Sequence, residues 1–112
     1  MTGIFSPNYK EILKMTVNFE KKDGTLTVAP VGRLDSVTSD ELSSFVEENF
    51  TDDVKTLIFD LGSVDFISSK GIRTLVVAYK SSRGREIKVI NPNPSVREIF
   101  RMSGLMKIFG IA

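Results

Sequence analysis

Two adjacent serines, Ser68 and Ser69, are the residues of this sequence whose position could support chemistry. They follow an apolar run at residues 56–59, and beyond them apolar residues recur at i, i+3, i+4 and i+7 over residues 72–79, which predicts one face of a helix. A helix start has unpaired N–H groups and the positive end of the helix dipole, both of which suit a capping oxygen or a phosphate. Two hypotheses follow: an ordinary helix N-cap, or a phosphorylated serine whose charge is read by a partner.

The composition excludes most other kinds of chemistry. Among 112 residues there is no cysteine and no histidine, which removes thiol catalysis, disulfides and the commonest general base. An enzyme would have to rely on Asp, Glu, Lys, Arg or Tyr, so we expect no catalysis and no cofactor. Asp35, Asp60 and Asp65 could in principle meet at a hard cation such as Mg²⁺. Turn-forming aspartates account for them without a metal, so none is expected.

The charge balance and the apolar runs point to one soluble domain. The net charge is +1, from 15 basic and 14 acidic residues, and 41% of the residues are hydrophobic. A basic cluster at Lys80, Arg83 and Arg85 has no aromatic residues interleaved, so no nucleic-acid partner is expected. The first residues lack the pattern of a signal peptide, and no apolar run approaches the roughly 20 residues that span a bilayer. We therefore expect no membrane insertion and a cytoplasmic address.

The N-terminal half predicts a hairpin. Apolar and polar residues alternate over residues 16–20 and 25–31, and the Asp-Gly pair between them is a strong turn signal. Pro30 indicates that the second strand is not hydrogen-bonded on both sides at that point. Residues 32–36 are expected to form a loop, and residues 1–14 an N-terminal extension.

A helix is predicted after this loop, with a capping box at its start. Thr38 is the expected N-cap, Glu41 is expected to reach back to it, and Val37 is expected to pack on Leu42 as a hydrophobic staple. Asn49 is the expected end of the helix.

The middle of the chain predicts a strand, a helix and a strand. The middle of residues 54–61 is apolar without alternation, as in a central strand covered on both faces. A helix over residues 69–82 and a strand over residues 87–90 follow through short joints, which implies a right-handed parallel crossover.

The C-terminal part predicts one more helix. Ser95 and Glu98 have the spacing of a second capping box, and Gly104 is expected to end the helix. The tail, residues 105–111, is expected to pack down and could form a short edge strand. The predicted order is β-β-α-β-α-β-α-(β), a mixed α/β fold with helices packed against the sheet.

Three segments together resemble a STAS domain, most closely the small stand-alone anti-sigma-factor antagonists of bacteria. Val-Gly-Arg-Leu-Asp at 31–35 looks like the family's Gly-x-Leu-Asp loop. Phe-Ile-Ser-Ser-Lys-Gly-Ile at 66–72 looks like its phosphorylation segment, commonly Phe-Met-Asp-Ser-Ser-Gly-Leu. Phe-Arg-Met-Ser-Gly-Leu at 100–105 looks like its C-terminal Phe-x-x-Ser-Gly-Leu motif. The resemblance covers residues 15–112, all but the extension.

The resemblance implies a binding switch without catalysis by this chain. The unphosphorylated antagonist binds an anti-sigma factor that is itself a serine kinase, and so frees a sigma factor. Phosphorylation of one serine releases the complex, and a metal-dependent serine phosphatase resets the switch. Aligned without gaps, the acceptor is Ser69, with Ser68 as the alternative. The chain is expected to be a monomer or weak dimer.

The surface that the resemblance implies for partner binding includes six residues: Asp35, Ser68, Ser69, Lys70, Arg73 and Thr74. Two positions depart from the family pattern. Ser68 replaces an aspartate, and Lys70 stands where a small or hydroxylated residue is usual and could partly neutralise a phosphate. These departures leave an alternative open: a STAS docking subunit of a transport complex, such as a lipid ABC transporter, without phospho-switching.

Overall fold

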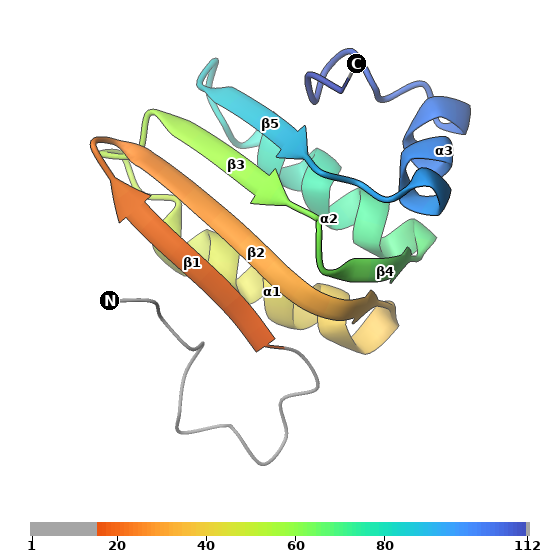
Figure 1. Cartoon of the computed structure of the whole chain (residues 1–112). Helices are drawn as coiled ribbons and strands as arrows, with labels where there is room; N and C mark the ends of the chain where they lie inside the picture. Colours follow the sequence, from red (N-terminus) through yellow and green to blue (C-terminus); the bar gives the residue numbers. More distant parts are fainter. Residues whose placement is uncertain (1–15, 112) are drawn as a thin grey trace.

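The computed structural model describes residues 16–111, which form a mixed sheet and three helices (Figure 1). Strand β1 (Thr16–Lys22) pairs antiparallel with β2 (Thr25–Leu34). Asp23 and Gly24 between them both have positive φ, 52° and 80°, as the tightest hairpin turn requires. The predicted hairpin is therefore confirmed, while the expected extension at 1–14 lies outside the described residues.

The remaining strands, β3 (Thr56–Asp60), β4 (Val64–Ile67) and β5 (Glu86–Ile90), all lie parallel to β2 or to one another. The sheet order is β1-β2-β3-β5, and β4 pairs with the far end of β2. Pro30 lies between the part of β2 that pairs with β3 and the part that pairs with β4. The prediction that β2 lacks a second hydrogen-bonded neighbour there is confirmed.

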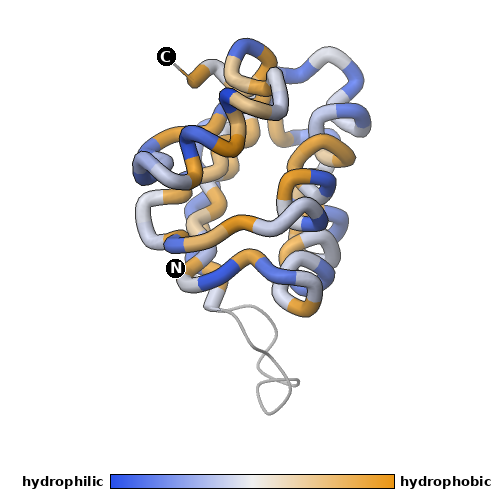
Figure 2. Tube along the Cα trace, turned by 90° about the vertical axis from the view of Figure 1, so that its right-hand side faces the viewer, coloured by the Kyte–Doolittle hydropathy of each residue, from blue (hydrophilic) through white to orange (hydrophobic). Residues whose placement is uncertain are grey.

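Helices α1 (Ser36–Asn49) and α2 (Ser69–Lys80) cover one face of this sheet, and α3 (Pro94–Met102) packs beside β4 (Figure 1). Seen from the side, the sheet and the two long helices form two layers (Figure 2). Side chains from both layers fill the space between them, and the largest that are fully buried include Phe59, Leu57, Leu42 and Leu75. The predicted class, a mixed sheet with helices against it, is confirmed. None of the described helices combines the length and apolar content that crossing a membrane requires.

The element order differs from the prediction in two places. Residues 64–67 form strand β4 alongside residues 32–34 of β2, so the predicted loop at 32–36 and the turn after β3 are both partly strand. The tail forms turns where an edge strand was one option. The tail still closes the edge of the sheet, because the Phe109 carbonyl accepts a hydrogen bond from Val89 N at 2.8 Å.

The predicted capping boxes of α1 and α3 are wrong. Asp35 caps α1, and Thr38 occupies the third helical position, from which its hydroxyl accepts a hydrogen bond from Asp35 N at 2.9 Å. Val37 is 53% exposed, so it forms no staple on the core. Asn93 caps α3 by accepting from Val96 N at 2.8 Å. Pro94 then occupies the first helical position, where proline fits because that N–H has no helical partner.

Candidate functional site

The first turns of α1 and α2 lie together at the carboxyl ends of strands β2 and β4. In the parallel pair β2–β4, Leu34 and Ile67 are partners, and each is the last residue of its strand. The next residue in each case is a helix N-cap, Asp35 for α1 and Ser68 for α2. The Leu34 carbonyl also accepts a hydrogen bond from Ser68 N at 2.8 Å. The end of one strand therefore fixes where the other strand's helix begins.

The two serines at the start of α2 have different roles. Ser68 has extended backbone angles, and its hydroxyl accepts a hydrogen bond from Gly71 N at 3.1 Å, so it is the N-cap. Ser69 is the first helical residue and is exposed. No hydrogen bond of its hydroxyl is found among the described residues. The capping hypothesis therefore holds for Ser68, whereas the Ser69 hydroxyl, at the positive end of the helix, has no partner within residues 16–111.

Gly71 allows α2 to start this close to the sheet. A Cβ at this buried position would lie 2.8 Å from Ile67 Cγ1 and 3.1 Å from both Leu34 Cβ and the Leu34 carbonyl oxygen. The 2.8 Å separation is well inside the ordinary contact distance between carbon atoms. The absence of a side chain at Gly71 therefore allows the first turn of α2 to pack directly against Leu34 and Ile67.

The start of α2 is also tied to α1. Lys70 Nζ lies 2.9 Å from Asp40 Oδ1 and 3.0 Å from Asp40 Oδ2. One turn further along, the Thr74 hydroxyl donates to the Lys70 carbonyl at 3.1 Å, with a longer contact of 3.4 Å to the Ser39 carbonyl. Asp40 was missed by the sequence analysis, because nothing local links residues thirty positions apart. The ion pair partly neutralises the charge of Lys70 and links α2 to α1.

Asp35 serves mainly to position α1. Its Oδ1 accepts from Val37 N and from Thr38 N, each at 3.0 Å. The hydrogen bond from Thr38 N, assisted by the Thr38 hydroxyl, Val37 N and the charge of Arg33, lowers the pKa of the Asp35 carboxyl below its usual value. Asp35 thus lies next to the start of α2, but its carboxylate is engaged within the chain.

Further exposed groups lie on the same elements. Arg73 follows Ser69 by one helical turn and is exposed. The guanidinium of Arg33 lies 4.2 Å above the ring of Phe66, which is its partner in the β2–β4 register and is 36% exposed. The sequence analysis did not select Phe66 as a site residue, although exposed aromatic side chains are enriched in protein–protein interfaces. The structure thus brings Ser68, Ser69, Lys70, Arg73 and Thr74 together on α2, with Asp35 beside them.

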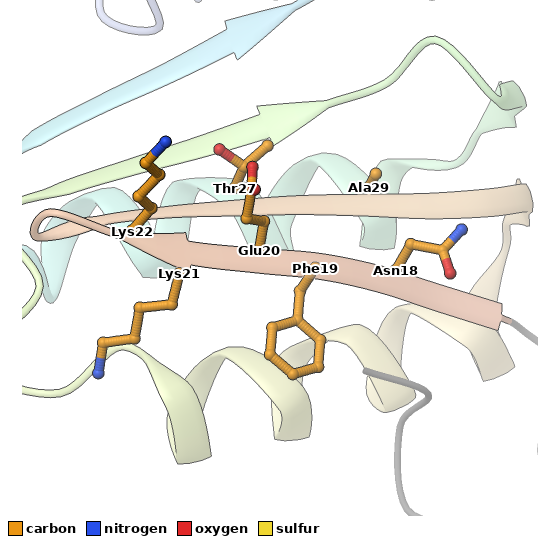
Figure 3. Close-up of a pocket in the computed structure, with 7 residues that line it drawn as sticks. All are labelled: Asn18, Phe19, Glu20, Lys21, Lys22, Thr27 and Ala29. Carbon is orange, nitrogen blue, oxygen red and sulfur yellow. The ribbon is translucent and has the colours of Figure 1, made fainter. Parts of the chain in front are cut away.

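Of two surface recesses formed by the described residues, the smaller adjoins this site. A recess of about 680 Å³ is formed by the β1–β2 hairpin (Figure 3). Asn18, Glu20 and Lys22 point to one side of it, while Phe19 and Lys21 point toward α1. A smaller one, about 200 Å³, lies between α1 and α2 and includes Thr74 in its lining. The hairpin recess does not include any residue of the predicted partner surface.

Asp35, Asp60 and Asp65, which were considered as metal ligands, do not form a cluster. Asp60 accepts hydrogen bonds from Gly62 N at 3.0 Å and from Asn91 Nδ2 at 3.2 Å, as a turn-forming aspartate does. Asp65 is exposed on β4. Within residues 16–111, no three carboxylate, histidine or cysteine side chains cluster in a way that could hold a metal ion.

The fold is that of a small α/β domain with an exposed serine at the first residue of a helix, and comparison with known proteins identifies the family. The family model described as "STAS domain" matches residues 16–112, so this chain belongs to the STAS family. A protein provisionally assigned as the anti-sigma factor antagonist BtrV of Bordetella bronchiseptica is 30% identical over 100 residues, which cover 88% of this chain and 86% of the relative.

Two further relatives carry the same kind of name. An anti-sigma F factor antagonist of Paenibacillus polymyxa is 29% identical over 102 residues, covering 88% of this chain and 87% of that protein. The crystal structure of an anti-sigma factor antagonist from Mycobacterium paratuberculosis superposes with a TM-score of 0.80 at 27% identity, covering 88% of this chain and 85% of that one. The similarity in each case spans nearly the whole domain.

The capping role of Asp35 gives a testable pH dependence. Because its pKa is lowered on folding, its carboxylate contributes stability that is complete above the usual value of 3.8 and is lost as the pH falls through the folded pKa. Asp35→Asn keeps a good N-cap without the charge. We expect the melting-temperature difference between wild type and Asp35→Asn to be constant above about pH 5 and to shrink below about pH 4. Calorimetry over this range tests it, and a difference that does not change with pH would contradict it.

Proposed function

We propose that this chain is an anti-sigma factor antagonist that acts as a partner switch, with Ser69 as its phosphoacceptor. Membership of the STAS family and relatives that carry that name support the general role. The choice of Ser69 as the phosphoacceptor rests on the different roles of the two serines at the start of α2. The Ser68 hydroxyl accepts a hydrogen bond from Gly71 N as the N-cap, whereas Ser69 is exposed and its hydroxyl has no hydrogen-bond partner among the described residues.

Phosphorylation of Ser69 is compatible with the fold. A kinase would transfer the γ-phosphoryl group of a nucleoside triphosphate: the Ser69 Oγ–P bond forms, the bond to the leaving diphosphate breaks, and the hydroxyl proton is released to solvent or base. The product has a charge of about −1.5 to −2 near neutral pH. At the first helical residue that charge faces unpaired N–H groups and the positive end of the helix dipole. The domain therefore stays folded after modification.

The same charge prevents binding of a partner packed on this edge. The partner surface consists of the exposed parts of the α2 start, with Ser69, Lys70, Arg73 and Thr74, and the adjoining α1 start at Asp35. The Ser68 hydroxyl, also expected in this surface, is directed to Gly71 N and does not face the partner. A protein that covers Ser69 must remove water from the phosphate, and an unmatched buried charge costs several kcal/mol. The partner is an anti-sigma factor with serine kinase activity, and a metal-dependent serine phosphatase restores the binding form. Both would act in the bacterial cytoplasm, where sigma factors work.

Affinity capture from the source organism tests this proposal. The paired baits are the wild-type chain and Ser69→Asp, compared by quantitative mass spectrometry. We expect the wild type to capture a serine kinase of the anti-sigma type and the variant to lose it. Recovery of one transporter component by both baits would instead identify a constitutive docking subunit and overturn the switch.

A further inference from the structure

We propose that a phosphate on Ser69 is held by Arg73 of the same helix, so that phosphorylation also withdraws this arginine from the partner. The proposal rests on the proposed function, because it takes Ser69 as the acceptor. It adds an intramolecular receptor for the phosphate, formed by this chain alone. The off state would then differ from the on state in two ways: a new negative charge at residue 69 and a neutralised cation at residue 73.

The spacing of the two residues carries the proposal. Ser69 and Arg73 are four positions apart on α2, and both are exposed. Residues at i and i+4 lie on the same face of a helix, about 5–6 Å apart at Cβ, and an anion N-terminal to a cation is the favourable order. A guanidinium can donate two parallel N–H groups to two phosphate oxygens. The geometry therefore suits a bidentate contact with no change in the backbone.

Arg73 is also available for this contact. Within residues 16–111 its guanidinium takes part in none of the side-chain hydrogen bonds or ion pairs at the α2 start, which involve Lys70, Gly71 and Thr74. Lys70, the other cation beside Ser69, is already paired with Asp40 of α1. Adjacent residues on a helix do not face each other, so Lys70 is also less well directed toward residue 69. The structure thus assigns Lys70 to the link between helices and Arg73 to the phosphate.

Arg33 and Asp35, at the end of β2, are further charged residues near the start of α2. Arg33 is packed over the Phe66 ring at 4.2 Å, and Asp35 is held by the N–H groups of α1. These groups and Asp40 are present in every variant compared below. Their influence on a phosphate at residue 69 therefore cancels when the Arg73 variants are compared with Lys80→Gln.

A titration of the phosphate tests the proposal without any partner. The full chain would be produced with phosphoserine encoded at position 69, and the second ionisation of the phosphate followed by ³¹P NMR against pH. A cation in contact favours the dianion, so its removal raises the phosphate pKa from a wild-type value below about 6. With Arg73→Gln we expect an increase of about 0.4, which corresponds to a strong i,i+4 ion pair. Arg73→Lys should lie between the two, since it keeps the charge but not the paired donors.

Lys80→Gln is the matched control. It removes one positive charge from the same helix, at an exposed residue roughly 16 Å along the axis from Ser69, beyond effective range in physiological salt. We expect its phosphate to titrate as in the wild type. An equal effect of Arg73→Gln and Lys80→Gln, or a larger effect of Lys70→Gln, would overturn the proposal. Such a result would leave the partner switch itself standing, because loss of capture by Ser69→Asp does not depend on Arg73.

Discussion

Ser69→Asp is expected to weaken binding of the captured anti-sigma partner by at least about 100-fold, a loss of about 2.7 kcal/mol. The reason is that a carboxylate at this exposed position must lose its water when the partner covers the α2 start. Within the isolated chain the same carboxylate lies at a helix N-terminus, where negative charge is stabilising by about 0.3–1 kcal/mol. The melting temperature should therefore stay within about 5 °C of the wild type. Isothermal titration calorimetry and differential scanning calorimetry measure the two quantities.

Ser68→Asp is the control that separates position from charge. Aspartate is as good an N-cap as serine, so the hydrogen bond from Gly71 N is kept. The charge is then turned toward the helix N–H groups rather than toward a partner. We expect capture by Ser68→Asp to stay within about tenfold of the wild type. Equal loss of binding in both variants would show that any acidic residue at this edge is sufficient, and that Ser69 has no special position.

Gly71→Ala is expected to destabilise the domain although alanine is the better helix former. In an exposed helix the exchange would stabilise by about 1 kcal/mol. Here the new Cβ would lie 2.8 Å from Ile67 Cγ1 and 3.1 Å from the Leu34 carbonyl oxygen, so the first turn of α2 must move away from the sheet. Overpacking of this kind costs about 1–3 kcal/mol. Chemical denaturation should show a net loss of stability, and partner affinity should fall with it because Ser69 moves.

Lys80→Ala provides the comparison for this variant. It replaces an exposed side chain on the same helix, and such changes usually alter stability by no more than about 0.5 kcal/mol. A Gly71→Ala protein more stable than the wild type would contradict the close packing of α2 on β2 and β4. Normal partner affinity in a destabilised Gly71→Ala protein would show that the position of the helix start does not control binding.

The features that the sequence predicted correctly depend on a long periodic pattern or on one or two neighbouring residues. The i, i+3, i+4, i+7 spacing after Ser69 predicted α2, and the Asp-Gly turn predicted the β1–β2 hairpin. Pro30 predicted the gap in pairing along β2, because a missing N–H is a local property of one residue. The order and spacing of three motifs pointed to the STAS family, and the family model confirms it.

Errors arose where tertiary contacts choose among local alternatives. Asp35, Ser36 and Thr38 can each cap a helix, and the end of β2 decides that Asp35 does. Strand β4 has only four residues and no clear alternation of burial, so it has no periodic signal of its own. The Lys70–Asp40 ion pair joins two helices whose starts are brought together only by the pairing of β2 with β4.

Mapping the phosphorylated residue tests the central claim most directly. The chain would be incubated with the captured anti-sigma kinase, ATP and Mg²⁺, and the products analysed by tandem mass spectrometry and size-exclusion chromatography. We predict one phosphate, located on Ser69 and absent from Ser69→Ala, together with dissociation of the complex. A phosphate on Ser68, or a complex that persists unmodified in the presence of ATP, would contradict the assignment of Ser69 as the switch.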